Sequence, residues 1–568
     1  MRLIGIRLIE MRWRSVASSR GDFDILGRSV VEAEPGCVSD AKRLPFSGRL
    51  PGRTAIKLCL WIATLGCIGS SGGCNHSLKR VDLARQQFAA GEVSAAQAEL
   101  DRLVKRGGPE ATAAELDLAV VELAAGQAAA AEARLRRLRN ELDQEDAVTA
   151  VANNAASMVA DDNTRRFQAA GYEQVMIRTL LAVCSLARDS ADVESYLNQA
   201  VMKQTQLRRQ REDRWRQVGL EGPAAETTEP EPSLAFAPYL RGVIREATHH
   251  DYDDAQRHYR LVSAMAPQFR PAAEDVRRAA VGVHSSPGHG VLYVLSLVGR
   301  GPVLEPIETP VTSGAVTIAA HLIQLDRDDQ VGSIPLNVPV QVPQVVVPPS
   351  DIRTIAVDTR FLDGAQPAEA VRHGVTQPLT DVAALAYHQN EAEKPWTIAR
   401  AVSRRIIKHS TVSAARRGLG LEGVGGTLFQ MATATAWTAA EKPDLRCWGL
   451  LPREIQVLRA ELPVGQHLVS LTPTAGDGTV PLVDASGGDT CRSLSVRIED
   501  ARNTYVIAIA PDRFVHIVPP AGLNQRQSAP AAVVADATRR RADRHGLPMP
   551  QRTTQPDDRN DRPDHVSR

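Results

Sequence analysis

The chain has 568 residues, and its 67 basic and 66 acidic side chains leave a formal net charge of only +1 at pH 7. No global positive field is therefore available to attract nucleic acid or an acidic membrane, and we expect no nucleic-acid partner. The length predicts roughly two to four domains with substantial cores. Aromatic residues make up only 4% and the first half is rich in alanine, which favours close-packed helices.

The stretch Leu58–Cys74 has the order of a secretory signal peptide, with basic residues before an apolar run and small residues after it. Ser71–Gly73 directly precede the last cysteine of the stretch. A cysteine after small residues indicates a bacterial lipoprotein signal, in which Cys74 is acylated and becomes the new N-terminus. Cys67 is the second candidate. The acyl chains would anchor the protein in a membrane, and a linker after the cysteine would set its reach.

This signal-like stretch starts late in the chain. Residues 1–57 show no sustained helical or strand period, so we interpret them as a leader that is either disordered or the product of a misassigned start, with the true start near Leu44–Arg53. The apolar run Leu58–Ile68 is only about half as long as the roughly 20 residues that a membrane-spanning helix needs. We therefore expect a lipid-anchored protein of the cell envelope that faces the periplasm. Secretion and a single membrane span are the alternatives.

The cysteines of the remaining chain predict neither a disulfide framework nor a zinc site. Of the seven in the sequence, only Cys184, Cys447 and Cys491 follow the signal-like stretch, and they show no CxxC spacing. One bridge between Cys447 and Cys491 stays open as an alternative in an oxidising compartment.

An internal repeat lies between residues 80 and 140. Its two copies share small and apolar positions at an offset of 35, namely Gly91 with Gly126, Ala96 with Ala131, and Leu100 with Leu135. This period is close to that of tetratricopeptide-type helical hairpins. In each copy the glycine would let the chain turn between two helices, and the alanine would let the helices approach closely.

Two further hairpins are predicted at Leu180–Val201 and Tyr239–Pro267, on either side of a linker rich in Pro, Glu and Thr. After about residue 280 the hydrophobic period changes to 2. The expected organisation is a leader (1–57), a signal and lipidation site (58–74), helical repeats (80–217), a linker (218–233), a helical repeat (234–280), a β-rich domain (288–520) with a helical insertion (380–440), and a disordered tail (521–568).

The predicted fold class is α+β, with an N-terminal tetratricopeptide-like helical array followed by a β-rich domain that carries a helical insertion. Pro335–Pro349 is expected only as an edge strand or as an extended wall segment, because proline cannot donate to a ladder. Asp500–Asn503 is expected to turn a hairpin, and Trp396–His409 to form a basic helix. The predicted strands are Val291–Val298, Ala315–Ile323, Ile352–Val357, Glu454–Arg459, His467–Leu471, Leu494–Ile498, Thr504–Ala510 and Phe514–Val518.

Three stretches together resemble a family of uncharacterised bacterial envelope lipoproteins with tetratricopeptide-like N-terminal repeats and a β-rich C-terminal domain. They are Tyr239-Leu-Arg-Gly242 before Asp251-Tyr252 and Ala255, then Gly299-Arg-Gly301-Pro302, and finally Asp444–Pro452 (DLRCWGLLP) followed by Leu462-Pro-x-Gly465-x-His467. The resemblance spans about Gly171 to Thr472. It implies the architecture and an envelope location, and no activity. The long leader and the extra tail depart from the family pattern.

Two motifs invite a ligand-binding interpretation. Gly418–Gly423 matches GxGxxG, but a basic helix precedes it where a dinucleotide site needs a strand, so we favour helix packing and expect no cofactor. His250, Asp254 and His258 follow each other at i, i+4 in a dense group of His and Asp residues. Because metal ligands must converge with further support, we interpret this group as an inter-helix turn capped by Asp side chains and predict no metal site.

Cys447, His467 and Asp477 are the residues that an enzyme would use. Cys447 is flanked by apolar residues and is expected to be a buried core cysteine, not an activated nucleophile. Asp477 begins an Asp-Gly-Thr triplet, which between strands is typical of a turn. We predict no catalytic residue. Three tryptophans are likewise expected to pack in the core and not to line a ligand pocket: Trp396, Trp437 and Trp448.

The predicted function is a non-catalytic scaffold or protein-interaction module. It would hold an unknown protein or peptide segment on the concave face of the helical array. The alternatives are an envelope hydrolase with a site in the β-rich domain, and an accessory protein of secretion or polymer export. A hydrolase would bring its polar groups together in a pocket.

Overall fold

A computed structural model describes the part of the chain that carries the fold. It comprises residues 74–151, 167–220, 232–323, 339–363, 368–418, 443–476, 478–484 and 487–519. Every described residue belongs to one unit, within Ser71–Arg568. The predicted leader, signal and tail lie outside the described residues. Among the helices that are described, none combines the length and apolarity needed to cross a membrane.

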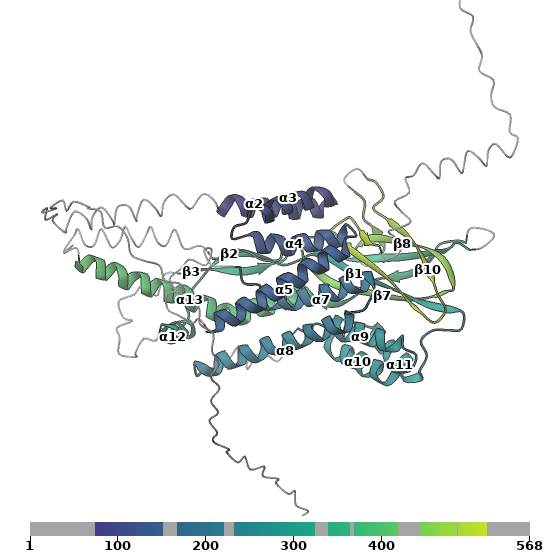
Figure 1. Cartoon of the computed structure of the whole chain (residues 1–568), viewed down its shortest axis with the longest axis horizontal. Helices are drawn as coiled ribbons and strands as arrows, with labels where there is room; N and C mark the ends of the chain where they lie inside the picture. Colours follow the sequence, from purple (N-terminus) through teal and green to yellow (C-terminus); the bar gives the residue numbers. More distant parts are fainter. Residues whose placement is uncertain are drawn as a thin grey trace, which may run out of the picture. The chain divides into compact units, whose positions relative to one another are not determined.

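The first half of this unit is helical (Figure 1). Its helices are α2 (Cys74–Ala89), α3 (Val93–Arg106), α4 (Ala111–Ala124), α5 (Ala128–Val151), α7 (Gly171–Arg188), α8 (Val193–Gln217), α9 (Phe236–Glu246), α10 (Tyr252–Met265) and α11 (Pro271–Val281). The first eight pack as the four predicted hairpins, and α11 adds a helix against α10. Because α2 begins at Cys74 itself, the expected linker after this cysteine is replaced by helix.

The two copies of the internal repeat have the same turn. The φ angles of Gly91 and Gly126 are 85° and 79°, in the left-handed region that favours glycine. After each glycine the next N–H donates to a carbonyl five residues back, from Glu92 to Gln87 (2.9 Å) and from Gln127 to Glu122 (2.8 Å). The alanines and leucines of the repeat are buried. The predicted hairpin period of 35 residues is confirmed.

The second half is rich in strands, and the predicted α+β fold class is confirmed. The strands are β1 (His289–Arg300), β2 (Val303–Thr309), β3 (Val340–Val346), β4 (Thr354–Phe361), β5 (Val371–Val375), β6 (Gln377–Asp381), β7 (Pro452–Pro463), β8 (Gly465–Ala475), β9 (Val480–Pro481), β10 (Arg492–Ile498), β11 (Asn503–Ala510) and β12 (His516–Val518). One sheet has the order β12-β11-β1-β7-β6, and a second has the order β10-β8-β4-β5 with β9 beside β8. β1 pairs in parallel with β11 and antiparallel with β7.

Strand β1 shows how the layers are stacked. Leu292 and Val294 pack with residues of the second sheet, whereas Tyr293 and Leu295 pack in a core shared with the helices. Successive side chains of a strand point to opposite faces, so the first sheet lies between the helices on one side and the second sheet on the other. The change from helix to strand near residue 285 therefore occurs within one continuous core.

The strand predicted at Ala315–Ile323 is wrong. These residues belong to helix α12 (Ser313–Leu322), and the hydroxyl of Thr312 caps it by accepting a bond from the Ala315 N–H (3.3 Å). Ala315, Ile318 and Ala319 are buried, a spacing of i, i+3, i+4 that fits one face of a helix. A short apolar run does not distinguish helix from strand by itself. The partner here is α13 (Val382–Gly418), which covers the first part of the predicted helical insertion and contains the expected basic helix.

The hairpin predicted at Asp500–Asn503 is also wrong, although a turn is present there. The strands on either side, β10 and β11, belong to different sheets, so the turn passes the chain from one layer to the other. Pro335–Pro349 contains β3, which pairs only with β2 in a two-stranded ribbon, as an edge strand should. Strands β2, β5, β6 and β9 were not predicted.

Candidate functional site

Helices and sheets meet at a stretch without helix or strand, Asp444–Leu451, here called the Cys447 segment. It leads directly into β7 and lies against helices α2, α4 and α7 through polar contacts. The Trp448 N–H donates to Glu173 Oε1 (2.7 Å), and the Leu450 N–H donates to Asp117 Oδ1 (2.9 Å). Two carboxylates from the helices thus bind the backbone of a segment that follows them by about 300 residues.

Arg85 on α2 completes this arrangement. Its guanidinium donates to Asp117 Oδ2 (2.7 Å) and to the carbonyl oxygen of Cys447 (2.6 Å). The same guanidinium lies so close to Gly449 that a Cβ at that position would be 2.3 Å from Cζ of Arg85. The glycine is therefore required for the arginine to reach both acceptors.

The two carboxylates differ in charge environment, although both are buried. Burial raises the pKa of Asp117, and the adjacent Arg85 guanidinium counteracts this. Burial also raises the pKa of Glu173, to about 7, although its bonds from the N–H groups of Trp448 and Ala170 act in the opposite direction. Within the described part of the chain Glu173 has no ion-pair partner. Glu173 is therefore poised to change protonation near neutral pH.

Glycines of the Gly299-Arg-Gly301 motif lie against the end of the Cys447 segment. A Cβ at Gly301 would be 2.0 Å from the carbonyl oxygen of Leu451, and one at Gly299 would be 2.9 Å from Cβ of Arg453. Two of the three stretches that carry the family resemblance are thus in contact. A small cavity of about 30 Å³ lies between them, and its lining includes Arg85, the glycines at 299, 301 and 449, and several apolar residues. It has room for about one water molecule.

Cys447 and His467 are not brought together. Burial raises the pKa of the Cys447 thiol to about 11, which leaves it protonated and unreactive. His467 lies on β8, where Nε2 is 2.8 Å from the carbonyl oxygen of Pro463 and the ring packs edge-on against Phe361. No hydrogen bond links the two side chains among the residues described, and Asp477 falls outside them. Cys447 and Cys491 are both free thiols, so the structure does not contain the disulfide that was left open between them.

The turn predicted at His249–Asp254 is present at residues 247–251, but Asp253, Asp254 and His258 lie on α10, and no Asp side chain caps this helix. The hydroxyl of Thr248 accepts from the Asp251 N–H (3.1 Å), while Asp251 and Asp254 face Arg245 at 3.5 and 3.4 Å. His249 Nε2 is 2.7 Å from the carbonyl oxygen of Ala501 at the turn between the two sheets. No group of three or more metal-ligating side chains converges in the described ranges.

The remaining candidate motifs are core positions or lie outside the described residues. Trp448 is fully buried in the main core, and Trp396 packs edge-to-face with Trp215 at a ring distance of 5.5 Å. This agrees with the expectation for both. Trp437 and all of the GxGxxG motif after Gly418 lie outside the part that the structure describes.

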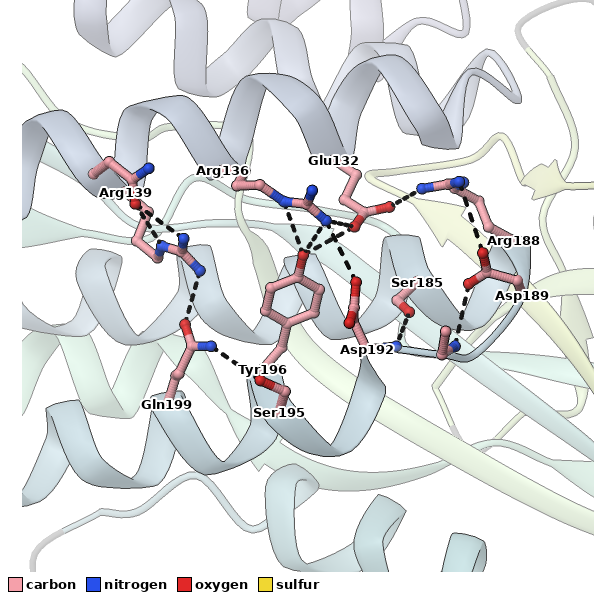
Figure 2. Close-up of polar contacts among 12 residues, drawn as sticks. Glu132, Arg136, Arg139, Ser185, Arg188, Asp189, Asp192, Ser195, Tyr196 and Gln199 are labelled. Carbon is pink, nitrogen blue, oxygen red and sulfur yellow. Dashed lines mark hydrogen bonds and ion pairs between the residues drawn. The ribbon is translucent and has the colours of Figure 1, made fainter.

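A polar seam joins the second and third hairpins (Figure 2). Figure 2 shows the Tyr196 hydroxyl of α8 pointing up to α5, where it donates to Glu132 Oε1 (2.9 Å) and accepts from Arg136 (2.5 Å). Arg188, at the end of α7, donates to the other oxygen of Glu132 (2.5 Å). Further along, Arg139 of α5 donates to Gln199 of α8 (2.8 Å). On the outer side of this seam, α5 has a shallow depression lined by Ala133, Arg136, Arg137, Asn140, Glu141 and Gln144.

Sequence reasoning did not identify Arg85, Asp117 or Glu173. A weak signal was present, because Asp117 lies within the apolar stretch LDLAVVELA and Glu173 opens a helix that is buried along almost its entire length. An acid buried within an apolar helix needs a polar partner. The partner itself could not be read from the spacing. No family model matches the chain, and no curated protein and no solved structure is detectably similar to it.

Proposed function

We propose that the protein is an exported scaffold of the cell envelope, held to a membrane by acyl chains on Cys74, that binds another protein through its helical hairpins. The array of hairpins supports this proposal, because stacked hairpins present extended surfaces suited to a protein segment. Cys74 is also the first residue of the first described helix. A chain that began there would keep every described element.

The outer surface of α5 and α8 is the binding surface in this proposal. The opposite side of the helices is occupied by the protein's own sheet and by the Cys447 segment, because Trp448 and Leu451 share the main core with α4 and α7. A partner on the sequence-predicted concave face would have to displace them. The outer surface carries Arg136 and Arg137 at 48% side-chain exposure, beside the depression on α5. Both guanidinium groups also pair within the protein, Arg136 with Glu132 and Arg137 with Glu141, and their exposed parts suit a polar partner segment with carboxylates.

The first test is mass spectrometry of the protein from membrane fractions of its native host. The proposal expects a mature chain that begins at an acylated Cys74. A soluble chain that retains Met1 without modification would contradict the export and anchoring part of the proposal. An acylated Cys67 would keep the anchor and move its position.

The binding surface is tested by photo-crosslinking in the same cells. A photoreactive residue at Asn140, which is exposed on α5, is expected to capture a discrete protein partner. The matched control places the same residue at Glu274, which is exposed on α11, and is expected to capture none. Equal capture at both positions, or capture only at residue 274, would exclude the outer surface of α5 as the partner site.

A further inference from the structure

The position of Cys74 fixes which end of the body would lie nearest a membrane. Helix α2 begins at this residue, and Val81, seven positions later, is already in the main core at 2% exposure. At 1.5 Å per residue, this helical stretch is about 10 Å long. An acyl group on Cys74 would therefore hold the first hairpin within roughly one Debye length of the headgroups at physiological salt.

The same end of the hairpin is rich in exposed cations. Because α2 and α3 are antiparallel, the last turn of α3 lies beside the start of α2, as the contact between Arg80 and Glu99 shows (3.6 Å). Lys105 and Arg106 form that last turn, and Lys79 lies in the second turn of α2. All three side chains are exposed, and within the described ranges none has an ion-pair partner.

The acids of this end are mostly engaged or buried. Glu99 is 8% exposed and is shared by Arg80 and Arg102, and Glu110 is 7% exposed. Asp82 pairs with Arg85 (3.5 Å), and Asp101, one turn before Lys105, is half-buried. The five cations of this end therefore exceed its four acids by one charge. The cations are Lys79, Arg80, Arg102, Lys105 and Arg106, and the acids are Asp82, Glu99, Asp101 and Glu110. Favourable interaction of Lys105 and Arg106 with the dipole of α3 accounts for their place in the last turn, but it does not account for Lys79 on the neighbouring helix.

We propose that the Cys74 end of the first hairpin is a membrane-contact surface that binds anionic phospholipid headgroups through Lys79, Lys105 and Arg106. This inference deepens the proposed function and rests on the anchor at Cys74. Clustered Lys and Arg residues beside a lipid anchor add an electrostatic attraction to the hydrophobic one. The contact would also orient the body, because anchor and cations lie at the same end of one rigid hairpin.

The test measures vesicle binding of the full chain, with Cys74→Ser to exclude acylation. Binding is compared on vesicles of phosphatidylcholine alone and of phosphatidylcholine with 30% phosphatidylglycerol. The triple variant Lys79→Gln/Lys105→Gln/Arg106→Gln is expected to bind the anionic vesicles roughly 100-fold more weakly, from the usual contribution of each cation near such a surface. Binding to neutral vesicles is expected to be unchanged.

The matched control removes three exposed cations elsewhere, in the variant Arg208→Gln/Arg209→Gln/Arg277→Gln on α8 and α11. It carries the same change in net charge and is expected to bind as the parent does. Equal weakening in both triple variants would overturn the proposal in favour of a net-charge effect. No preference of the parent for anionic vesicles would also overturn it. The assay uses no acyl chain, so its outcome is separate from that of the mass spectrometry on Cys74.

Discussion

Two buried glutamates of this protein, each 1% exposed, are stabilised in different ways. Glu246, at the end of α9, receives two bonds from Arg278 of α11, one of them at 3.0 Å, and one from the Tyr259 hydroxyl of α10 (2.6 Å). Glu173, at the start of α7, receives backbone N–H groups from Trp448 (2.7 Å) and Ala170 (2.8 Å). One acid is neutralised by a cation and the other is not.

The difference follows from what each glutamate joins. Three helices adjacent in sequence meet at Glu246, and each contributes a side chain, so a cation can be placed there. Glu173 instead meets an extended segment whose free donors are backbone N–H groups. A carboxylate satisfies such donors well, but its charge stays buried without a counter-ion. The contact between helices and sheet is therefore expected to respond to pH near neutrality through Glu173. At the helix–helix site, burial raises the pKa of Asp275 to about 6, so this site is expected to respond at a lower pH.

The largest expected effect is the loss of the cation at the first site. Arg278→Met would leave Glu246 and Asp275, which is 2.7 Å from the guanidinium, buried without a counter-charge. Removing one partner of a buried ion pair typically costs about 3–5 kcal/mol. Chemical denaturation at pH 7 measures this cost. A loss below about 1 kcal/mol would show that Arg278 is not the group that neutralises these acids.

The second prediction concerns pH at Glu173. Its pKa in the fold, about 7, lies above its value in the unfolded chain, so its favourable contribution is complete below about pH 4.5 and is lost as pH rises through about 7. Glu173→Gln removes this titration. The free energy of unfolding of the wild type, relative to the variant, should fall by roughly 2–3 kcal/mol between pH 5 and pH 8.

Glu461→Gln is the control for this titration. Burial acts to raise the pKa of Glu461, but its bonds from Ser286 together with the charges of Arg459 and His289 lower it below its usual value. Its contribution is therefore present above the unfolded pKa and is lost only as pH falls below the range tested. The free energy of unfolding of this variant should change with pH in the same way as that of the wild type between pH 5 and pH 8. If the free energy of unfolding of Glu173→Gln also changes with pH as that of the wild type does, the buried, unpaired state of Glu173 is contradicted.

The smallest expected effect tests the shape of the same junction. Gly301→Ala places a Cβ 2.0 Å from the backbone oxygen of Leu451, and a backbone atom cannot move aside as a side chain can. We expect a loss of about 1–3 kcal/mol, the usual cost of forcing an extra group into a packed site. In Gly314→Ala, on helix α12, the new Cβ meets nothing within 4 Å, and a small gain is expected. The midpoint temperatures of thermal denaturation are measured for both variants. Equal midpoint temperatures would exclude close packing at Gly301.

Local spacing in the sequence was enough to predict the hairpins and most strands. The glycines at 91 and 126 and their matching alanines predicted the first two hairpins, because a turn conformation and a helical stripe depend on residues close together in the chain. The strand prediction at Ala315–Ile323 was wrong because a short apolar run contains too few residues to show whether its period is that of a helix or of a strand. The turn at Asp500–Asn503 was recognised, but whether it joins strands of one sheet or of two depends on strand order.

The sequence by itself determined the fold class, the helical period and the order of elements, since these rest on spacing within a few turns or strands. The tertiary structure alone decided which charges are buried and what they bind. Glu173 and Trp448 are 275 residues apart, and Asp117 and Leu450 are 333 apart. No periodicity links such positions. Only the packing of helices on the sheet creates the low-dielectric site in which Glu173 becomes a group that titrates near neutral pH.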